Sequence, residues 1–226
     1  MSEHITLQER EAFYKTVYTR RDVRNEFLPE RIPADVLLRI LTAAHHAPSV
    51  GFMQPWDFII IKNDKTKQAI KQEFIIANNE AAERLSGKRK QQYQALKLEG
   101  ITESPLNICV TCDRTRTGDF VLGRTTNSDM DLYSTVCAVQ TLWLAARAEN
   151  IGVGWVSILH EKKLKDLLNL PDHITPIAYL CLGYVSEFHD KPDLERKGWL
   201  PRRKVEQHLH NEIWYSNKND DDDDDS

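Results

Sequence analysis

The sequence predicts an α/β (α+β) fold, with one central sheet covered by helices, and three observations carry that prediction. Helical and strand patterns alternate along the chain, which is typical of a sheet with helices on both faces. Hydrophobic residues make up 41% of the 226 residues, enough to bury a substantial core. No stretch rich in Gly, Pro or Ser divides the chain, so we expect one domain over residues 1–215.

Two helices and a strand are expected in the first part of the chain. Helical signals cover residues 7–18, and Pro33 is a favourable first-turn residue for a second helix over residues 34–47. Apolar residues recur in that segment at helical spacing and predict a buried face: Val36, Leu37, Ile40, Leu41 and Ala44. The short apolar run at residues 57–61 predicts a buried strand.

The segment 65–98 is charged and largely helical in composition, with a break at Ser86-Gly87. Two interpretations stay open for it: a lid over a site, or a pair of solvated surface helices, since highly charged helices usually lie on the surface. A turn at residues 100–105 ends the segment. The β-rich run at residues 106–112 then predicts a second strand.

The longest helix is expected at residues 129–150. An apolar stripe at helical spacing indicates a core or dimer helix: Leu132, Val136, Val139, Leu142, Trp143 and Ala146. Residues 152–157 predict a glycine turn and a strand, residues 161–168 a short helix, and residues 177–185 a last strand. The elements therefore alternate to the end of the domain.

Composition excludes several classes of protein. The formal net charge is −4 and no basic stripe carries interleaved aromatic residues, so nucleic-acid binding is not expected. No stretch approaches the roughly 18 apolar residues of a membrane span, and residues 1–18 are too polar for a signal peptide. Four cysteines in a chain of this length do not suggest a disulfide framework. We therefore expect a cytoplasmic protein that does not bind a membrane.

Two further features receive no chemical role. Cys109 and Cys112 have a CxxC spacing, but no second ligand pair completes a zinc site, and His45 and His46 show no metal spacing. No metal is expected. The acidic run within residues 216–226 predicts a disordered, solvated tail.

Three guanidinium groups lie within five residues, in the sequence Arg20-Arg21-Asp22-Val23-Arg24. Burying them without an anionic partner would be costly, and Asp22 cannot neutralise three cations. Phosphate is the natural partner, because guanidinium presents paired planar N–H donors to it. The cluster alone is also compatible with a solvated, arginine-rich turn.

A second motif follows the second expected helix: Pro-Ser-Val-Gly-Phe-Met-Gln-Pro-Trp over residues 48–56. We interpret Gln54, Pro55 and Trp56 as a rigid turn that orients the next strand and places an indole in the core. His45 or His46, at the end of the preceding helix, either meets a ligand or interacts with the helix C-terminus.

These motifs, taken together, resemble the nitroreductase-like flavoprotein family. The residues that carry the resemblance are the RRxxR element at 20–24, the PSxxxxQPW element, the glycine pair at 152 and 154, and Arg202-Arg203. The match runs from about residue 15 to 205. The sequence is most similar to the 5,6-dimethylbenzimidazole synthase branch, because Asp22 and Phe52 replace the Ser and Asn that are typical of ordinary nitroreductases.

The resemblance implies a homodimer with a central mixed sheet and flavin mononucleotide (FMN) at the subunit interface. The residues expected to bind FMN are Arg20, Arg21, Asp22, Val23, Arg24, Ser49, Gly154 and Arg202, with Arg203 as an alternative to Arg202. The arginines would hold the phosphate and ribityl groups. Gly154 would allow backbone N–H groups to approach the ring closely.

The resemblance also implies an activity: oxygen-dependent fragmentation of reduced FMN (FMNH2) to 5,6-dimethylbenzimidazole, the lower ligand of vitamin B12, and erythrose 4-phosphate. FMNH2 and O2 would be substrates, and a separate flavin reductase would supply the electrons. Asp22 and Ser157 are the expected catalytic residues, with Asp22 exchanging protons. Their structural interpretations are a salt-bridged spacer for Asp22 and a strand hydroxyl for Ser157.

Two other functions stay open. One is an NAD(P)H-dependent nitro- or quinone reductase that keeps its FMN, although Asp22 and Phe52 argue against it. The other is a flavin-binding module without catalysis. The sequence has no GxGxxG motif for a separate dinucleotide module.

Overall fold

A computed structural model of the chain describes residues 4–214. Its helices are α1 (Leu7–Thr19), α2 (Ala34–His45), α3 (Asp64–Glu83), α4 (Gly87–Gln94), α5 (Met130–Ala148), α6 (Glu161–Leu168) and α7 (Asp193–Arg196), with 3-10 turns at Val50–Phe52 and Val205–His208. Its strands are β1 (Trp56–Ile61), β2 (Leu106–Asp113), β3 (Ile151–Val156) and β4 (Ile174–Tyr184). The acidic tail expected at residues 216–226 lies outside the described residues, and the single domain over residues 1–215 stays a prediction.

The four strands form one sheet in the order β1-β2-β4-β3, and each neighbouring pair is antiparallel. The predicted α/β fold is confirmed. Within residues 4–214, the parallel part of the expected mixed sheet is a single bridge between Asp22 and Val153, beside β3. The strand β3 therefore forms one edge of the sheet, and the arginine-rich turn lies along that edge.

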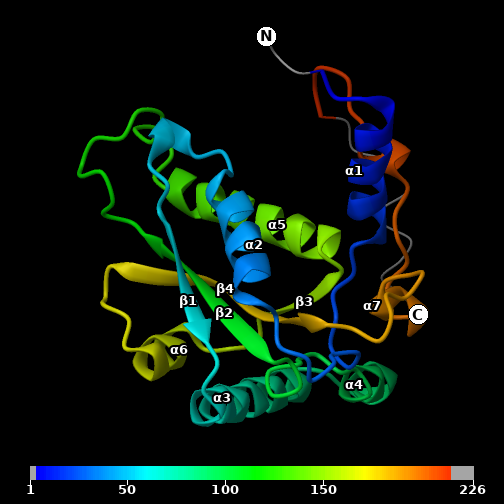
Figure 1. The fold of residues 1–226 in the computed structure, drawn as a ribbon. Helices are drawn as coiled ribbons and strands as arrows, with labels where there is room; N and C mark the ends of the chain where they lie inside the picture. The colour runs from blue at the N-terminus through cyan, green and yellow to red at the C-terminus, as the bar shows by residue number, and fades with distance from the viewer. Residues whose placement is uncertain (1–3, 215–226) are drawn as a thin grey trace.

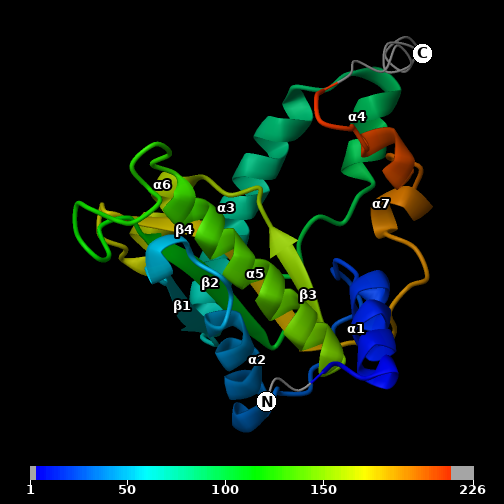
Figure 2. The same cartoon turned by 90° about the horizontal axis from the view of Figure 1, so that it is seen from above.

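Helices cover both faces of the sheet, as Figures 1 and 2 show. On one face, α2 and α5 pack with the sheet around a core that includes Ile40, Leu142 and Leu180. On the other face, α3 and α6 pack around Ile70, Leu164 and other apolar residues. The central strand β2 is buried over seven consecutive residues, which explains its continuous apolar run.

Side-chain caps define several helix ends. Thr6 and Glu9 form a capping box before α1, with the Glu9 amide 3.3 Å from Thr6 Oγ1 and the Thr6 amide 2.8 Å from the Glu9 carboxylate. Asn63 accepts hydrogen bonds from the amides of Lys65 and Thr66 and so begins α3. The break expected at Ser86-Gly87 separates α3 from α4, as the sequence predicted.

Helix α1 and the segment that follows β4 lie outside the two helical layers that cover the sheet, beside the end of α5 (Figure 1). No residue of α1 is buried, and it exposes Phe13, Tyr14 and Tyr18. Exposed apolar residues also occur along the C-terminal segment, among them Leu200, Val205 and Leu209. Such surfaces are typical of an interface with another chain.

Two boundaries differ from the sequence-based expectation. Gly152 and Gly154 lie within β3 and not in a turn before it, because β3 pairs with β4 from Ile151 onward. Strand β4 begins at Ile174, earlier than expected, because Pro176 is accommodated at a register shift opposite Val110 and Thr111. Within residues 4–214, none of the helices has the length and apolar character needed to cross a lipid bilayer.

Candidate active site

The arginine-rich turn is attached to the edge of β3 by backbone hydrogen bonding. The Val23 amide donates to the Val153 carbonyl at 3.1 Å. Gly154 permits this approach, because a Cβ atom there would lie 2.1 Å from the Val23 carbonyl oxygen and 2.4 Å from an Arg24 nitrogen. The glycine was expected to make room for a flavin ring. In the structure, the group that approaches it is the backbone of the turn itself.

Asp22 is held in one orientation by two partners. Arg24 forms a paired contact with it, through Nη1 to Oδ1 at 2.7 Å and Nη2 to Oδ2 at 2.5 Å. The Trp155 amide on β3 donates to Oδ1 at 3.0 Å. The carboxylate is therefore fixed at the end of β3 while 45% of its side chain remains exposed. It is both oriented and accessible.

Burial raises the pKa of Asp22 above its ordinary value, and Arg24, the Trp155 amide and Arg20 oppose that rise. Because almost half of the side chain is open to solvent, desolvation is incomplete and the rise is moderated. A carboxyl group with a raised pKa exchanges protons more readily near neutral pH. The position therefore suits acid–base chemistry better than an ordinary surface aspartate would.

Arg21 bonds to the protein's own backbone. Its guanidinium donates to the carbonyl oxygens of Tyr18 at 2.8 Å, Arg20 at 2.7 Å and His189 at 2.8 Å, and also to that of Asp190. These contacts join the end of α1 to the segment after β4. These bonds give Arg21 a structural position, and its role as a phosphate ligand stays a prediction.

Arg24 is also occupied by the protein. Only 13% of its side chain is exposed, and besides Asp22 it donates to the carbonyl oxygen of Trp155 at 2.7 Å. Two of the three clustered guanidinium groups therefore have internal acceptors. The sequence does not reveal these acceptors, because Trp155 lies 131 residues from Arg24 and His189 lies 168 residues from Arg21.

Arg20 remains available for an external anion. Its guanidinium lies over the Trp143 ring at 4.6 Å and, within residues 4–214, makes no hydrogen bond or salt bridge. Burial lowers the pKa of Arg20, Asp22 opposes that change, and the nearby charges of Arg21 and Arg202 lower it further. Arg202 is exposed and likewise has no carboxylate partner among the described residues. Arg20 and Arg202 are thus two cations close enough to influence each other, and guanidinium donors of this kind suit a phosphate.

The Pro48–Trp56 motif forms a tight turn, and the indole of Trp56 is buried as predicted, only 3% exposed. Its N–H donates to His45 Nδ1 at 3.1 Å, and His46 contacts the Thr42 carbonyl at the end of α2. Ser49 Oγ is half-buried and accepts a hydrogen bond from the Gln54 amide at 3.1 Å. The Ser49 hydroxyl, which is expected to contact the flavin, therefore also closes the Pro48–Trp56 turn.

The same turn holds three residues in the left-handed backbone region: Gly51 with φ 59°, Phe52 with φ 52° and Gln54 with φ 45°. For the two residues that are not glycine, this conformation costs about 1–3 kcal/mol each. Phe52 is nonetheless 81% exposed. A strained turn that presents an aromatic side chain to solvent is typical of a functional site.

Ser157 follows β3 directly and is exposed. It lies two residues after Trp155, the residue whose amide orients Asp22. Ser157 and the Asp22 contact therefore belong to the same end of β3.

Sequence reasoning missed the Trp155 amide as the partner of Asp22, since a backbone donor leaves no signal in residue types. It also missed Arg116, which bonds to the Gln54 and Trp56 carbonyl oxygens from a loop 60 residues away. The one available signal was the pair of glycines at 152 and 154, which marked a close backbone approach.

The fold and the site define an α/β protein in which an oriented carboxylate lies among clustered arginines at the edge of the sheet. The profile of the nitroreductase family matches residues 17–184, and the chain belongs to that family.

Two similar proteins are 5,6-dimethylbenzimidazole synthases. The one from Rhodospirillum rubrum is 41% identical over 184 residues, covering 81% of this chain and 87% of its own. The one from Rhodobacter capsulatus is 37% identical over 190 residues, covering 84% and 91%. Among solved structures, an iodotyrosine deiodinase bound to FMN and 3-iodo-L-tyrosine superposes with a TM-score of 0.70 at 21% identity, covering 90% of this chain and 100% of that one. The last likeness concerns the fold alone.

Proposed function

We propose that this protein is a 5,6-dimethylbenzimidazole synthase that fragments reduced FMN with molecular oxygen. Three relatives with that name are 33–41% identical to it over most of the chain. The observation that carries the proposal is Asp22, a carboxylate fixed by Arg24 and the Trp155 amide and lying near Arg20, whose guanidinium has no salt bridge within residues 4–214. Arg24 offsets the charge of this acid, and the pair leaves the carboxylate oriented yet partly exposed, as a proton-exchanging group requires.

The phosphate of the substrate would bind between Arg20 and Arg202. Both guanidinium groups lack an anionic partner within the described residues, and the charge of Arg202 already acts on Arg20. The remaining groups expected at the flavin are Val23, Ser49 and Gly154, of which Val23 and Gly154 lie on the backbone contact between the turn and β3. Arg21 and Arg24 would support the site through the bonds that hold its backbone and its carboxylate.

Asp22 would accept and return the proton that the reacting ring must exchange. The bound flavin would supply the redox chemistry with O2, and the protein would supply the proton transfer and keep water out. Arg24 and the Trp155 amide keep the carboxylate in place during that transfer. Ser157, at the same end of β3, would donate a hydrogen bond to the group that changes charge.

The site is proposed to be completed by a second copy of the chain. The exposed apolar side chains of α1, α5 and the C-terminal segment support a homodimer. Residues 65–98, which form α3 and α4, would serve as the lid. A separate flavin reductase would supply FMNH2, and a cytoplasmic location is consistent with such a partner.

The test is to mix the purified protein with chemically reduced FMN in air and to analyse the products by liquid chromatography and mass spectrometry. We expect 5,6-dimethylbenzimidazole and loss of FMN. Recovery of intact oxidised FMN without benzimidazole would overturn the proposal. If the protein also oxidised NAD(P)H with a nitroarene or quinone as acceptor, the reductase function would replace it; binding of FMN without either turnover would indicate a flavin-binding module.

A further inference from the structure

We propose that Arg116 is a positioning residue that holds the Ser49–Trp56 turn in the shape needed to meet the flavin. The inference rests on the proposed function, because the flavin contact of this turn belongs to that proposal. Arg116 lies on the loop between β2 and α5, outside every motif that the sequence analysis identified. Its contacts, and not its place in the sequence, point to this role.

The Ser49–Trp56 turn is strained, and its own hydrogen bonds close only its middle part. Phe52 and Gln54 adopt positive φ values, and the internal hydrogen bonds of the turn are the Phe52 amide to Ser49 O at 3.1 Å, the Met53 amide to Val50 O at 3.2 Å and the Gln54 amide to Ser49 Oγ at 3.1 Å. A left-handed residue other than glycine persists where surrounding groups fix it. Something outside the turn must therefore hold it.

The end of the turn is held by the β2–α5 loop. Arg116 Nη1 donates to the carbonyl oxygens of Gln54 at 3.0 Å and Trp56 at 3.1 Å. The carbonyl oxygen between them, that of Pro55, accepts from the Asp113 amide at 2.7 Å. The carbonyl groups of Gln54, Pro55 and Trp56 are thus all bound by two residues of the same loop, Asp113 and Arg116.

The Arg116 guanidinium is itself fixed by carboxylates. Its Nη2 donates to Asp57 at 2.6 Å, and its Nε lies 3.7 Å from Asp113. The planar fork can serve Asp57 and two carbonyl groups together, whereas a lysine ammonium would reach fewer of them with less directional control. The geometry therefore favours arginine at this position.

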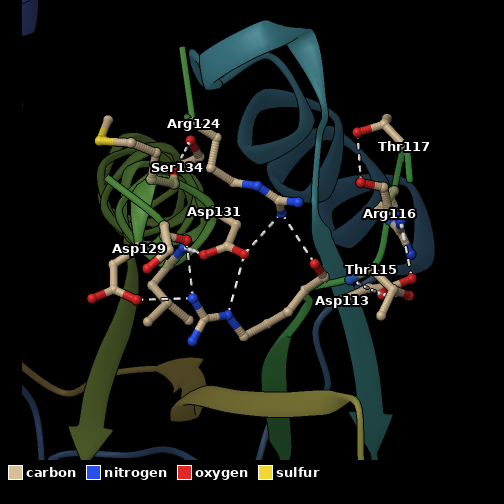
Figure 3. A network of polar contacts seen from close by, with 12 residues as sticks. Asp113, Thr115, Arg116, Thr117, Arg124, Asp129, Asp131 and Ser134 are labelled. Carbon is tan, nitrogen blue, oxygen red and sulfur yellow. Dashed lines mark hydrogen bonds and ion pairs between the residues drawn. The ribbon is translucent and has the colours of Figure 1, made fainter. Parts of the chain in front are cut away.

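The loop that carries Arg116 is anchored by a buried carboxylate, shown in Figure 3. Asp131, 1% exposed, accepts from Arg114 Nε and from Arg124 Nη1, each at 3.2 Å. Arg124 also donates to the carbonyl oxygens of Arg114 at 3.0 Å and Gly118 at 3.3 Å, which ties both halves of the loop together. These bonds make the β2–α5 loop rigid, so Arg116 can hold the Ser49–Trp56 turn in a fixed position.

The start of the turn is held by the same loop and by α5. The Val50 amide donates to Ser134 Oγ at 3.2 Å. A Cβ atom on Gly51 would lie 2.6 Å from a Val121 methyl group and 2.8 Å from the Leu122 carbonyl oxygen, so the loop presses against the turn at this point. The turn is therefore fixed at both ends, and Arg116 supplies its only charged contact among the described residues.

The experiment compares the wild-type protein with Arg116→Gln and Arg116→Lys. Hydrogen–deuterium exchange of the Phe52, Met53 and Gln54 amides reports on the turn, and fluorescence titration with FMN reports on binding. We expect Arg116→Gln to raise the exchange rates and the Kd for FMN at least tenfold each. Arg116→Lys should restore part of both, because it keeps the charge.

Arg39→Gln is the matched control, since Arg39 makes comparable contacts with Asp35 and Glu149 on the outside of α2. It should leave turn exchange and the Kd unchanged. Unchanged exchange in Arg116→Gln overturns the proposal, and so does faster exchange with an unchanged Kd. If Arg116→Gln does not fold, the Arg116→Lys values decide: no change in exchange or Kd overturns the proposal. The benzimidazole assay is read separately, so a wild-type protein that binds FMN without fragmenting it overturns only the proposed function.

Discussion

At the scale of single residues, three arginines of one turn bond in three different ways. Arg20 lies over Trp143 without an anion, Arg21 binds backbone carbonyl groups, and Arg24 binds Asp22. The sequence presents them as equivalent cations. Their substitutions should therefore give different results.

Arg20→Ala should weaken FMN binding without unfolding the protein. It would remove the proposed charge-assisted bond to phosphate, which would contribute about 1.5–3 kcal/mol, or roughly 10- to 150-fold in Kd. Fluorescence titration measures the effect, and Arg10→Ala on exposed α1 is the control. An unchanged Kd would show that the phosphate lies elsewhere.

Arg21→Ala should instead lower stability, since it leaves the segment after β4 without its link to α1. Losing a charged donor to several carbonyl groups should reduce the free energy of unfolding by about 2 kcal/mol or more. Urea unfolding provides the measurement. A variant as stable as wild type, with only its flavin affinity reduced, would return Arg21 to the phosphate site.

Asp22→Asn should keep FMN binding and lose benzimidazole formation. The amide can still accept from the Trp155 N–H but cannot take up a proton, so the rate should fall by about 10²- to 10⁴-fold. Product analysis under single-turnover conditions measures it, with Asp35→Asn as a control for loss of an aspartate–arginine pair. Equal rates in the Asp22 variant and wild type would remove Asp22 from the mechanism.

At the scale of elements, the arginine-rich turn at residues 20–24 packs against β3 at Gly154, where there is no room for a side chain. Gly154→Ala would place a methyl group 2.1 Å from the Val23 carbonyl oxygen, so the turn must move. Overpacking of this kind costs about 1–3 kcal/mol. We expect a lower thermal midpoint and a higher Kd for FMN. An unchanged thermal midpoint together with an unchanged Kd would contradict the close approach of the arginine-rich turn to β3.

A second inter-element contact should depend on pH. His160, before α6, contacts Glu73 through Nδ1 and Glu80 of α3 through Nε2 at 2.8 Å. The hydrogen bond to Glu73, followed by that to Glu80, raises the pKa of His160 above its usual value. The stabilisation is complete below the unfolded pKa of about 6.5 and is lost as pH rises through the higher folded value.

Thermal midpoints of wild type and His160→Gln at several pH values test this contact. The stability advantage of wild type should be larger at pH 6 than at pH 9. Parallel curves for the two proteins would contradict the proposed linkage.

At the scale of the whole molecule, the exposed apolar face of α5 should be covered by a second chain. Val136 on α5 and Leu167 on α6 are each 41% exposed, which makes them a matched pair on different faces of the sheet. Light scattering should give twice the mass of one chain for wild type and for Leu167→Arg. Val136→Arg should dissociate the dimer, because it places a charge in an apolar interface. A monomeric wild-type protein would contradict the homodimer.

Features that depend on neighbouring residues could be predicted from the sequence, whereas contacts between residues far apart in the chain could not. Helix α1, the break between α3 and α4, and the buried indole of Trp56 depend on local pattern and were predicted. The Trp155 amide that orients Asp22 and the His189 carbonyl that accepts from Arg21 are more than 130 residues away in sequence, and a backbone donor or acceptor carries no residue-type signal. The positions in the site could be proposed from motifs, but the division of tasks among them required the fold.

The single bridge between Asp22 and Val153 has a consequence for how the chain avoids self-association. An unpaired outer strand offers a template for cross-molecule β-pairing and aggregation. Here the Val23 amide and the Asp22 carboxylate occupy the Val153 carbonyl and the Trp155 amide on that border of the sheet. The arginine-rich turn at residues 20–24 therefore also covers the edge of β3 against pairing with another molecule. Mutations that detach this turn should increase aggregation and lower the yield of folded protein as well as the activity.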